Sequence, residues 1–125
     1  MSSPRLTVTL QGEPGHATML RFTVHANESG RLCLYQTPFE GFAASILDVR
    51  TTDGHSVAYL GRMVKRRPPN DSDLVRLEAG EHRTTTFDLA QHYAIESGTR
   101  YTVRFKGNPD LNGLPDSNVL EISAP

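Results

Sequence analysis

Apolar and polar residues alternate along several short stretches of the chain. In residues 5–11, Leu6, Val8 and Leu10 fall on one side of an extended backbone and polar residues on the other. A period of two is typical of a strand with one buried face. The same pattern, with its interruptions, predicts strands over residues 5–11, 18–26, 31–35, 45–51, 55–60, 74–77, 83–89, 100–106 and 118–123.

The residues between these stretches predict turns. Asp53-Gly54 gives the best hairpin signal, because this pair is favoured where both central residues take positive φ. Pro38 removes a backbone donor and Gly41 permits positive φ, so the chain must turn between them. Asp88-Leu89 opens a single turn that leads to Tyr93, and no long helix is supported.

About nine short strands at regular spacing predict an all-β fold, an immunoglobulin-like antiparallel β-sandwich of about seven to nine short strands. Tyr93 and Tyr101 flank a turn at Gly98, which resembles the corner where such sandwiches tie a tyrosine hydroxyl to nearby backbone. The alternative is two ordinary core tyrosines, and both interpretations predict buried rings. The length of 125 residues fits one domain, residues 1–125.

Composition narrows the classes of partner. A net charge of -1 with 22% charged residues gives no overall attraction to nucleic acid or to an anionic membrane. No apolar run approaches a membrane span or a signal peptide, so we expect a soluble protein, secreted or periplasmic if it is processed. The compartment and the oligomeric state stay open. Cys33 is the one cysteine, which excludes an intramolecular disulfide.

Residue spacing predicts neither catalysis nor a metal site. The five histidines, at positions 16, 25, 55, 82 and 92, show no spacing typical of zinc ligands. Cys33 lies between Leu32 and Leu34, where a cysteine is usually a packed residue. No nucleophile elbow, phosphate-binding loop or suggestive carboxylate pair occurs. We therefore expect a protein that is not an enzyme and takes no cofactor.

The run Lys65-Arg66-Arg67, followed by Pro68-Pro69, has several interpretations. It fits a solvated loop, a contact with a partner protein, or a protease-processing site. The solvated loop is the leading interpretation and a partner contact comes second, whereas nucleic-acid binding is disfavoured because no aromatic residues are interleaved with the cations. A loop stiffened by proline also loses little entropy on docking.

Several motifs in order resemble one family. These are TPFEGF (residues 37–42), VAYLGRMVKRRPPNDSD (57–73), LEAGE (77–81), FDLAQHY (87–93) and SGTRYTV (97–103). Together they resemble the amino-terminal prodomain of the deuterolysin and peptidyl-Lys metalloendopeptidases, the aspzincins, over residues 6–105. The catalytic half of that family carries HExxH and a further aspartate ligand, and neither is found here.

The resemblance implies an immunoglobulin-like sandwich that precedes, folds with or inhibits a zinc metalloendopeptidase. The chain would be either part of a precursor or a separate protein acting in trans. Our candidates for the contact are Thr37, Pro38, Phe39, Glu40 and Gly41 together with Arg62, Lys65, Arg66 and Arg67. Alternatively, the turn residues have only structural roles. A variant in which Cys33 binds the protease zinc requires an accessible thiol. The rival class is an immunoglobulin-like binding or adhesion module unrelated to proteolysis.

Overall fold

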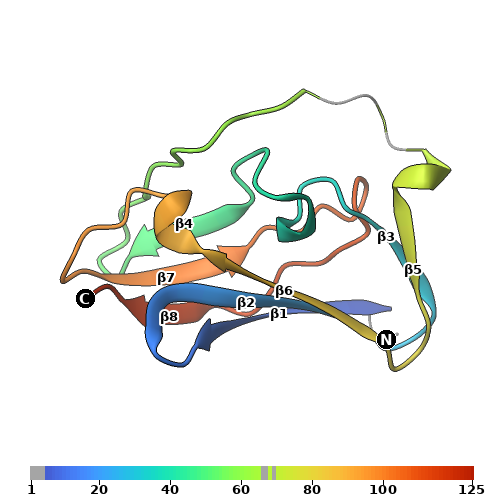
Figure 1. Ribbon diagram of the computed structural model, residues 1–125, viewed down its shortest axis with the longest axis horizontal. Coiled ribbons are helices and arrows are strands. Elements are labelled where there is room, and N and C mark those ends of the chain that lie inside the picture. Colours follow the sequence, from blue (N-terminus) through green and yellow to red (C-terminus); the bar gives the residue numbers. More distant parts are fainter. Residues whose placement is uncertain (1–4, 66–67, 69) are drawn as a thin grey trace.

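The computed structural model describes residues 5–65, 68 and 70–125 (Figure 1). These residues form eight strands and three single turns of 3₁₀ helix. The strands are β1 (Leu6–Glu13), β2 (His16–Ala26), β3 (Gly30–Cys33), β4 (Leu47–Thr51), β5 (Leu74–Leu77), β6 (His82–Asp88), β7 (Arg100–Phe105) and β8 (Leu120–Ser123). The short helices are η1 (Pro38–Glu40), η2 (Asp71–Asp73) and η3 (Leu89–Gln91).

Three antiparallel sheets make up the fold, with strand orders β1-β2-β6, β4-β7-β8 and β3-β5. Immunoglobulin sandwiches place strands A, B and E in one sheet and C, F and G in the other. The first two sheets follow those two orders, and Figure 1 shows β4 and β7 facing β1, β2 and β6 across the molecule. The predicted antiparallel β-sandwich is confirmed.

The core lies between these two sheets and uses the residues that alternate inward. Leu20, Phe22 and Val24 of β2 are completely buried, as are Val103 and Phe105 of β7. The rings of Phe22 and Phe105 meet edge to face with centroids 4.9 Å apart, so the two sheets are joined by aromatic packing.

The two-stranded sheet extends the ribbon formed by β2 and β6. The Ala26 amide donates to the Glu81 carbonyl at 2.9 Å, and the Gly80 amide donates to the Ala26 carbonyl at 2.8 Å. Beyond this kink, β3 pairs with β5, with Gly30 opposite Leu77. The ribbon therefore continues past the sandwich, and residues 34–37 lead from the end of β3 to η1.

Both tyrosines predicted to be buried are buried. The Tyr101 hydroxyl accepts a hydrogen bond from the Glu96 amide at 2.7 Å, which is the tie to upstream backbone expected of a tyrosine corner. The Tyr93 hydroxyl accepts from the Leu47 amide at 3.0 Å. Each ring thus fills the core while its polar end is satisfied by backbone.

The strand predicted over residues 55–60 is wrong. Only isolated bridges form there, between Arg50 and Ser56 and between Tyr59 and Tyr93. The bridge to β4 consists of two bonds, from the Thr51 amide to the His55 carbonyl and from the Val57 amide to the Val49 carbonyl. The chain then crosses to the turn at residues 92–94. The alternation was read correctly, since Val57 and Tyr59 are partly buried, but alternation does not specify the hydrogen-bonding partner.

The turn at Asp53-Gly54 exists but differs from the predicted type. Gly54 has φ of 96°, whereas Asp53 does not have positive φ. The Thr51 amide donates to the His55 carbonyl, and the Gly54 amide donates to the Thr51 carbonyl, both at 2.9 Å. The loop therefore contains three residues, 52–54, a length that needs positive φ only at its last position.

Candidate recognition site

The turn at residues 37–41 is built largely into the sandwich. Thr37 is 0% exposed, and its hydroxyl donates to the Leu34 carbonyl at 2.7 Å and accepts from the Phe39 amide. Pro38 is also buried, while Gly41 is exposed and has φ of 78°. The side chains of Thr37 and Pro38 are thus enclosed and offer no surface to a partner, which narrows the predicted contact.

Phe39 and Glu40 also serve the turn itself. The Phe39 ring packs edge to face on Phe22, with centroids 5.3 Å apart, and the Arg83 guanidinium lies 5.2 Å from the same ring. One carboxylate oxygen of Glu40 accepts from the Gln36 amide at 2.7 Å. Gln36 takes φ of 55°, so this bond supports a backbone conformation that is unusual for a residue other than glycine. Most residues of this turn therefore have a structural role, as the alternative interpretation of the turn predicts.

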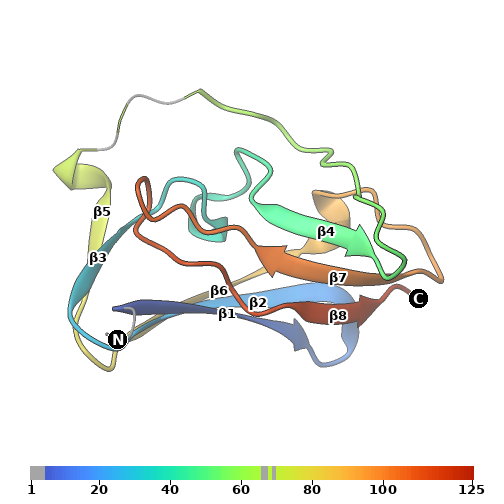
Figure 2. The same ribbon diagram turned by 180° about the vertical axis from the view of Figure 1, so that it is seen from behind.

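The cationic candidates lie on the connection between β4 and β5. Figure 2 shows the part of this connection that follows β4, drawn in green, running over the outside of the molecule on the side away from β1, β2 and β6. Arg62 and Lys65 are exposed. Arg66 and Arg67 lie outside the described residues. The structure therefore leaves Arg62 and Lys65 as accessible cations on this connection.

The same connection carries exposed apolar side chains, which sequence reasoning missed. Leu60 is 62% exposed and Met63 is 78% exposed, and Val64 is exposed as well. Among the described residues, the other large apolar side chain this exposed is Val119, in the approach to β8. The signal was available, because Met63 and Val64 interrupt a polar, proline-rich loop. We call residues 60–65 the recognition segment.

Backbone hydrogen bonds hold the recognition segment near both of its ends. The Leu60 amide donates to the His92 carbonyl, just after η3, at 2.8 Å. The Val64 amide donates to the Ala43 carbonyl, also at 2.8 Å. Ala43 closely follows Gly41, which is the exposed residue of the predicted contact at residues 37–41. Gly41 therefore lies near the recognition segment.

Tyr59 adds a contact within the connection. Its hydroxyl donates to the Arg62 carbonyl at 2.7 Å, and its ring lies 5.3 Å from the ring of Tyr93. Partial burial raises the pKa of Tyr59, although the nearby Arg62 charge opposes this. The hydroxyl is therefore protonated at neutral pH and remains a donor.

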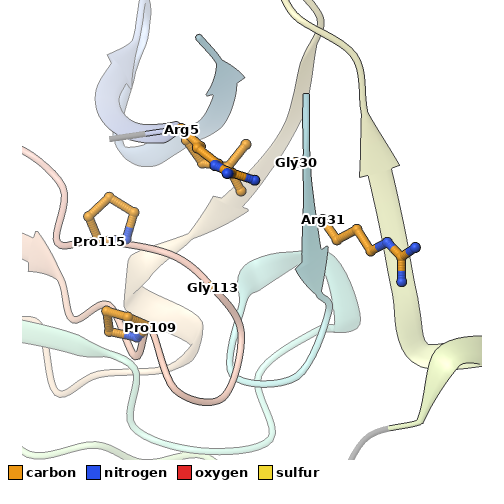
Figure 3. Close-up of a pocket in the computed structure, with 7 residues that line it drawn as sticks. Arg5, Gly30, Arg31, Pro109, Gly113 and Pro115 are labelled. Atoms are coloured by element: carbon orange, nitrogen blue, oxygen red, sulfur yellow. The ribbon is translucent and has the colours of Figure 1, made fainter. Parts of the chain in front are cut away.

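A separate pocket lies where the start of β1, β3 and the loop between β7 and β8 converge (Figure 3). Its volume is about 390 Å³, and its lining residues are Arg5, Leu6, Gly30, Arg31, Pro109, Gly113 and Pro115. These described lining residues include no histidine, cysteine, aspartate or glutamate. They thus provide no side chain suited to general acid or base chemistry near neutral pH.

In the described part of the chain, no group of three or more histidine, cysteine, aspartate or glutamate side chains is placed to hold a metal ion. In residues 5–65, 68 and 70–125 no helix has the length and apolar character needed to cross a membrane. Cys33 is a free thiol and is 1% exposed.

Comparison with models of known protein families and with curated proteins finds no match for this chain.

Proposed function

We propose that this chain is a non-catalytic domain that binds a zinc metalloendopeptidase through the recognition segment. The sandwich acts as the scaffold, and the segment acts as the contact. The identity of the partner comes from the resemblance to aspzincin prodomains, and the location of the contact comes from the exposure of residues 60–65.

One observation carries the proposal: the longest motif of the resemblance, residues 57–73, contains the recognition segment. Residues required only for folding are expected to be buried, as the aromatic residue of SGTRYTV is, Tyr101. Leu60 and Met63 instead leave most of their side-chain surface in water. Exposed apolar residues grouped in this way are typical of interaction sites.

The composition of the segment suits a protein interface. Methionine and arginine are enriched at such interfaces, whereas lysine is depleted there, and the rims of interfaces are polar. Met63 with Leu60 and Val64 would supply the apolar centre of the contact. Arg62 and Lys65 would supply charge at its edge, where they favour complementary carboxylates and speed association.

An inhibition assay tests the proposal. The purified chain is titrated into a purified endopeptidase of the deuterolysin class, with binding followed by calorimetry and peptide cleavage followed by fluorescence. We expect saturable binding and, if the segment occupies the cleft, slower cleavage. An absence of both heat of binding and inhibition would reject the proposal and favour a binding module unrelated to proteolysis.

A further inference from the structure

Gly61 lies directly beneath the side chain of Tyr59. A Cβ atom at position 61 would fall 2.4 Å from the Tyr59 hydroxyl oxygen and 2.6 Å from the ring carbon that bears it. Gly61 does not have positive φ, so the backbone conformation itself does not demand glycine. Instead, only glycine fits while the Tyr59 side chain stays in this position.

Tyr59 is fixed from its other side by the core. Its ring packs on Tyr93, which is buried and whose hydroxyl accepts a hydrogen bond from the Leu47 amide. Tyr93 is part of the buried core, so its ring limits the movement of the Tyr59 ring. Tyr59 in turn reaches forward over Gly61 to the Arg62 carbonyl.

The recognition segment is therefore supported at three places. The Leu60 amide is bonded to His92 and the Val64 amide to Ala43, while the Tyr59 hydroxyl holds the Arg62 carbonyl between them. With the backbone held in this way, the side chains at positions 62 and 63 extend into solvent from a defined place.

We infer that Tyr59 and Gly61 form a clasp that holds the recognition segment in the shape in which it enters the cleft of the endopeptidase. Ordering a loop on binding costs conformational entropy, and a preformed loop avoids most of that cost. Protease inhibitors commonly bind with little change in backbone. The choice of an endopeptidase rests on the proposed function, whereas the clasp rests on the contacts described above. Tyr59 and Gly61 are positioning residues that act on the shape of residues 62 and 63.

Hydrogen exchange tests the clasp without any partner. Tyr59→Phe removes the hydroxyl and keeps the ring, and Gly61→Ala pushes the ring away. Because a hydrogen bond typically contributes a net ~1 kcal/mol, we expect the Leu60 and Val64 amides to exchange about fivefold faster in each variant. Gly12→Ala is the control, because its new Cβ meets nothing within 4 Å. Unchanged exchange at Leu60 and Val64 in both clasp variants would overturn the inference.

Binding to the purified deuterolysin-class endopeptidase tests the role of the clasp in recognition. We expect both clasp variants to bind about fivefold or more weakly than the native chain, with the melting temperature lowered by only a few degrees, as the loss of one hydrogen bond implies. Native affinity in both variants would overturn the inference and leave the proposed function standing. Failure of the native chain to bind would reject the proposed function, and with it the recognition role of the clasp, whatever the exchange rates show.

Discussion

At the scale of single residues, Cys33 is enclosed by the fold. Its side chain is 1% exposed, and its sulfur accepts a hydrogen bond from the Tyr35 amide at 3.4 Å. A buried thiol is out of reach of a reagent in solution. We predict that a thiol reagent does not react with the native protein and reacts fully in guanidinium. Rapid reaction of the native protein would restore the idea that Cys33 binds the protease zinc.

Tyr101 combines a buried ring with a backbone tie. Truncation of a buried aromatic residue costs roughly 3–5 kcal/mol, so Tyr101→Ala should lower the unfolding free energy by about that amount. Tyr101→Phe keeps the ring and loses the bond from Glu96, so its effect should be only ~1 kcal/mol. Chemical denaturation measures both variants. Equal stability of the alanine variant and the native chain would contradict the core described here.

His92 gives the fold a dependence on pH. Its ring stacks on Phe42 with centroids 3.9 Å apart, and burial lowers its pKa from the ordinary value of 6.5, although Asp88 opposes this shift. As pH falls through the ordinary value of 6.5, His92 takes up a proton in the unfolded chain before it does so in the folded chain. The free energy of unfolding therefore decreases as pH falls from 6.5 toward the lower pKa of the folded chain.

Denaturation at pH values of about 7.5 and about 5.5 should therefore show lower stability at the acidic value, by a modest amount because the ring is partly exposed. The carboxyl groups of Asp53 and Glu78 also have lowered pKa values, but from ordinary values of 3.8 and 4.5, below this window. His92→Gln should show a smaller difference between the two pH values. An equal difference in this variant would assign the effect to other groups.

At the scale of elements, the connection between β4 and β5 carries two described cations, Arg62 and Lys65, that the fold does not need. Arg62 and Lys65 are exposed, and exposed charges contribute little to stability. We predict that Arg62→Ala combined with Lys65→Ala shifts the melting temperature by less than about 2 °C. A loss comparable to that of Tyr101→Ala would mean that the connection is structural.

Strand positions were largely predictable because each inward face is marked by apolar residues. The bounds of β5, residues 74–77, were predicted correctly, and those of β6 differ by one residue at each end. Residues 55–60 failed because the pattern there reports which side chains face inward, while the backbone pairs briefly with β4 and then with residues 92–94. A local pattern of apolar residues does not identify a hydrogen-bonding partner that lies far along the chain.

The candidate site was predictable only in part. A proline-rich cationic stretch correctly indicated an exposed connection at Arg62 and Lys65. The burial of Thr37 could not be read from its neighbours, because its hydroxyl bonds to the Leu34 carbonyl and the turn folds inward onto Phe22. The contact between Tyr59 and Gly61 depends on the path of the connection, which the sequence pattern does not specify.

At the scale of the whole molecule, the fold separates a packed core from an exposed connection. Two sheets enclose a continuous apolar core, and the connection between β4 and β5 carries exposed apolar side chains over the outside. With a net charge of only -1, the molecule has little long-range attraction for a charged partner. Under the proposed function, recognition would therefore come mainly from local contacts in the recognition segment.

The most direct test compares two exposed apolar surfaces. Leu60→Ser combined with Met63→Ser alters the recognition segment, and Val119→Ser alters the approach to β8, where Val119 is 62% exposed, the same as Leu60. Affinity for a purified deuterolysin-class endopeptidase is measured by calorimetry. We predict that the double variant loses at least about tenfold in affinity, as expected of apolar side chains that become buried in the complex. Val119→Ser should bind like the native chain. Equal affinity of all three proteins would contradict the assignment of residues 60–65 as the contact.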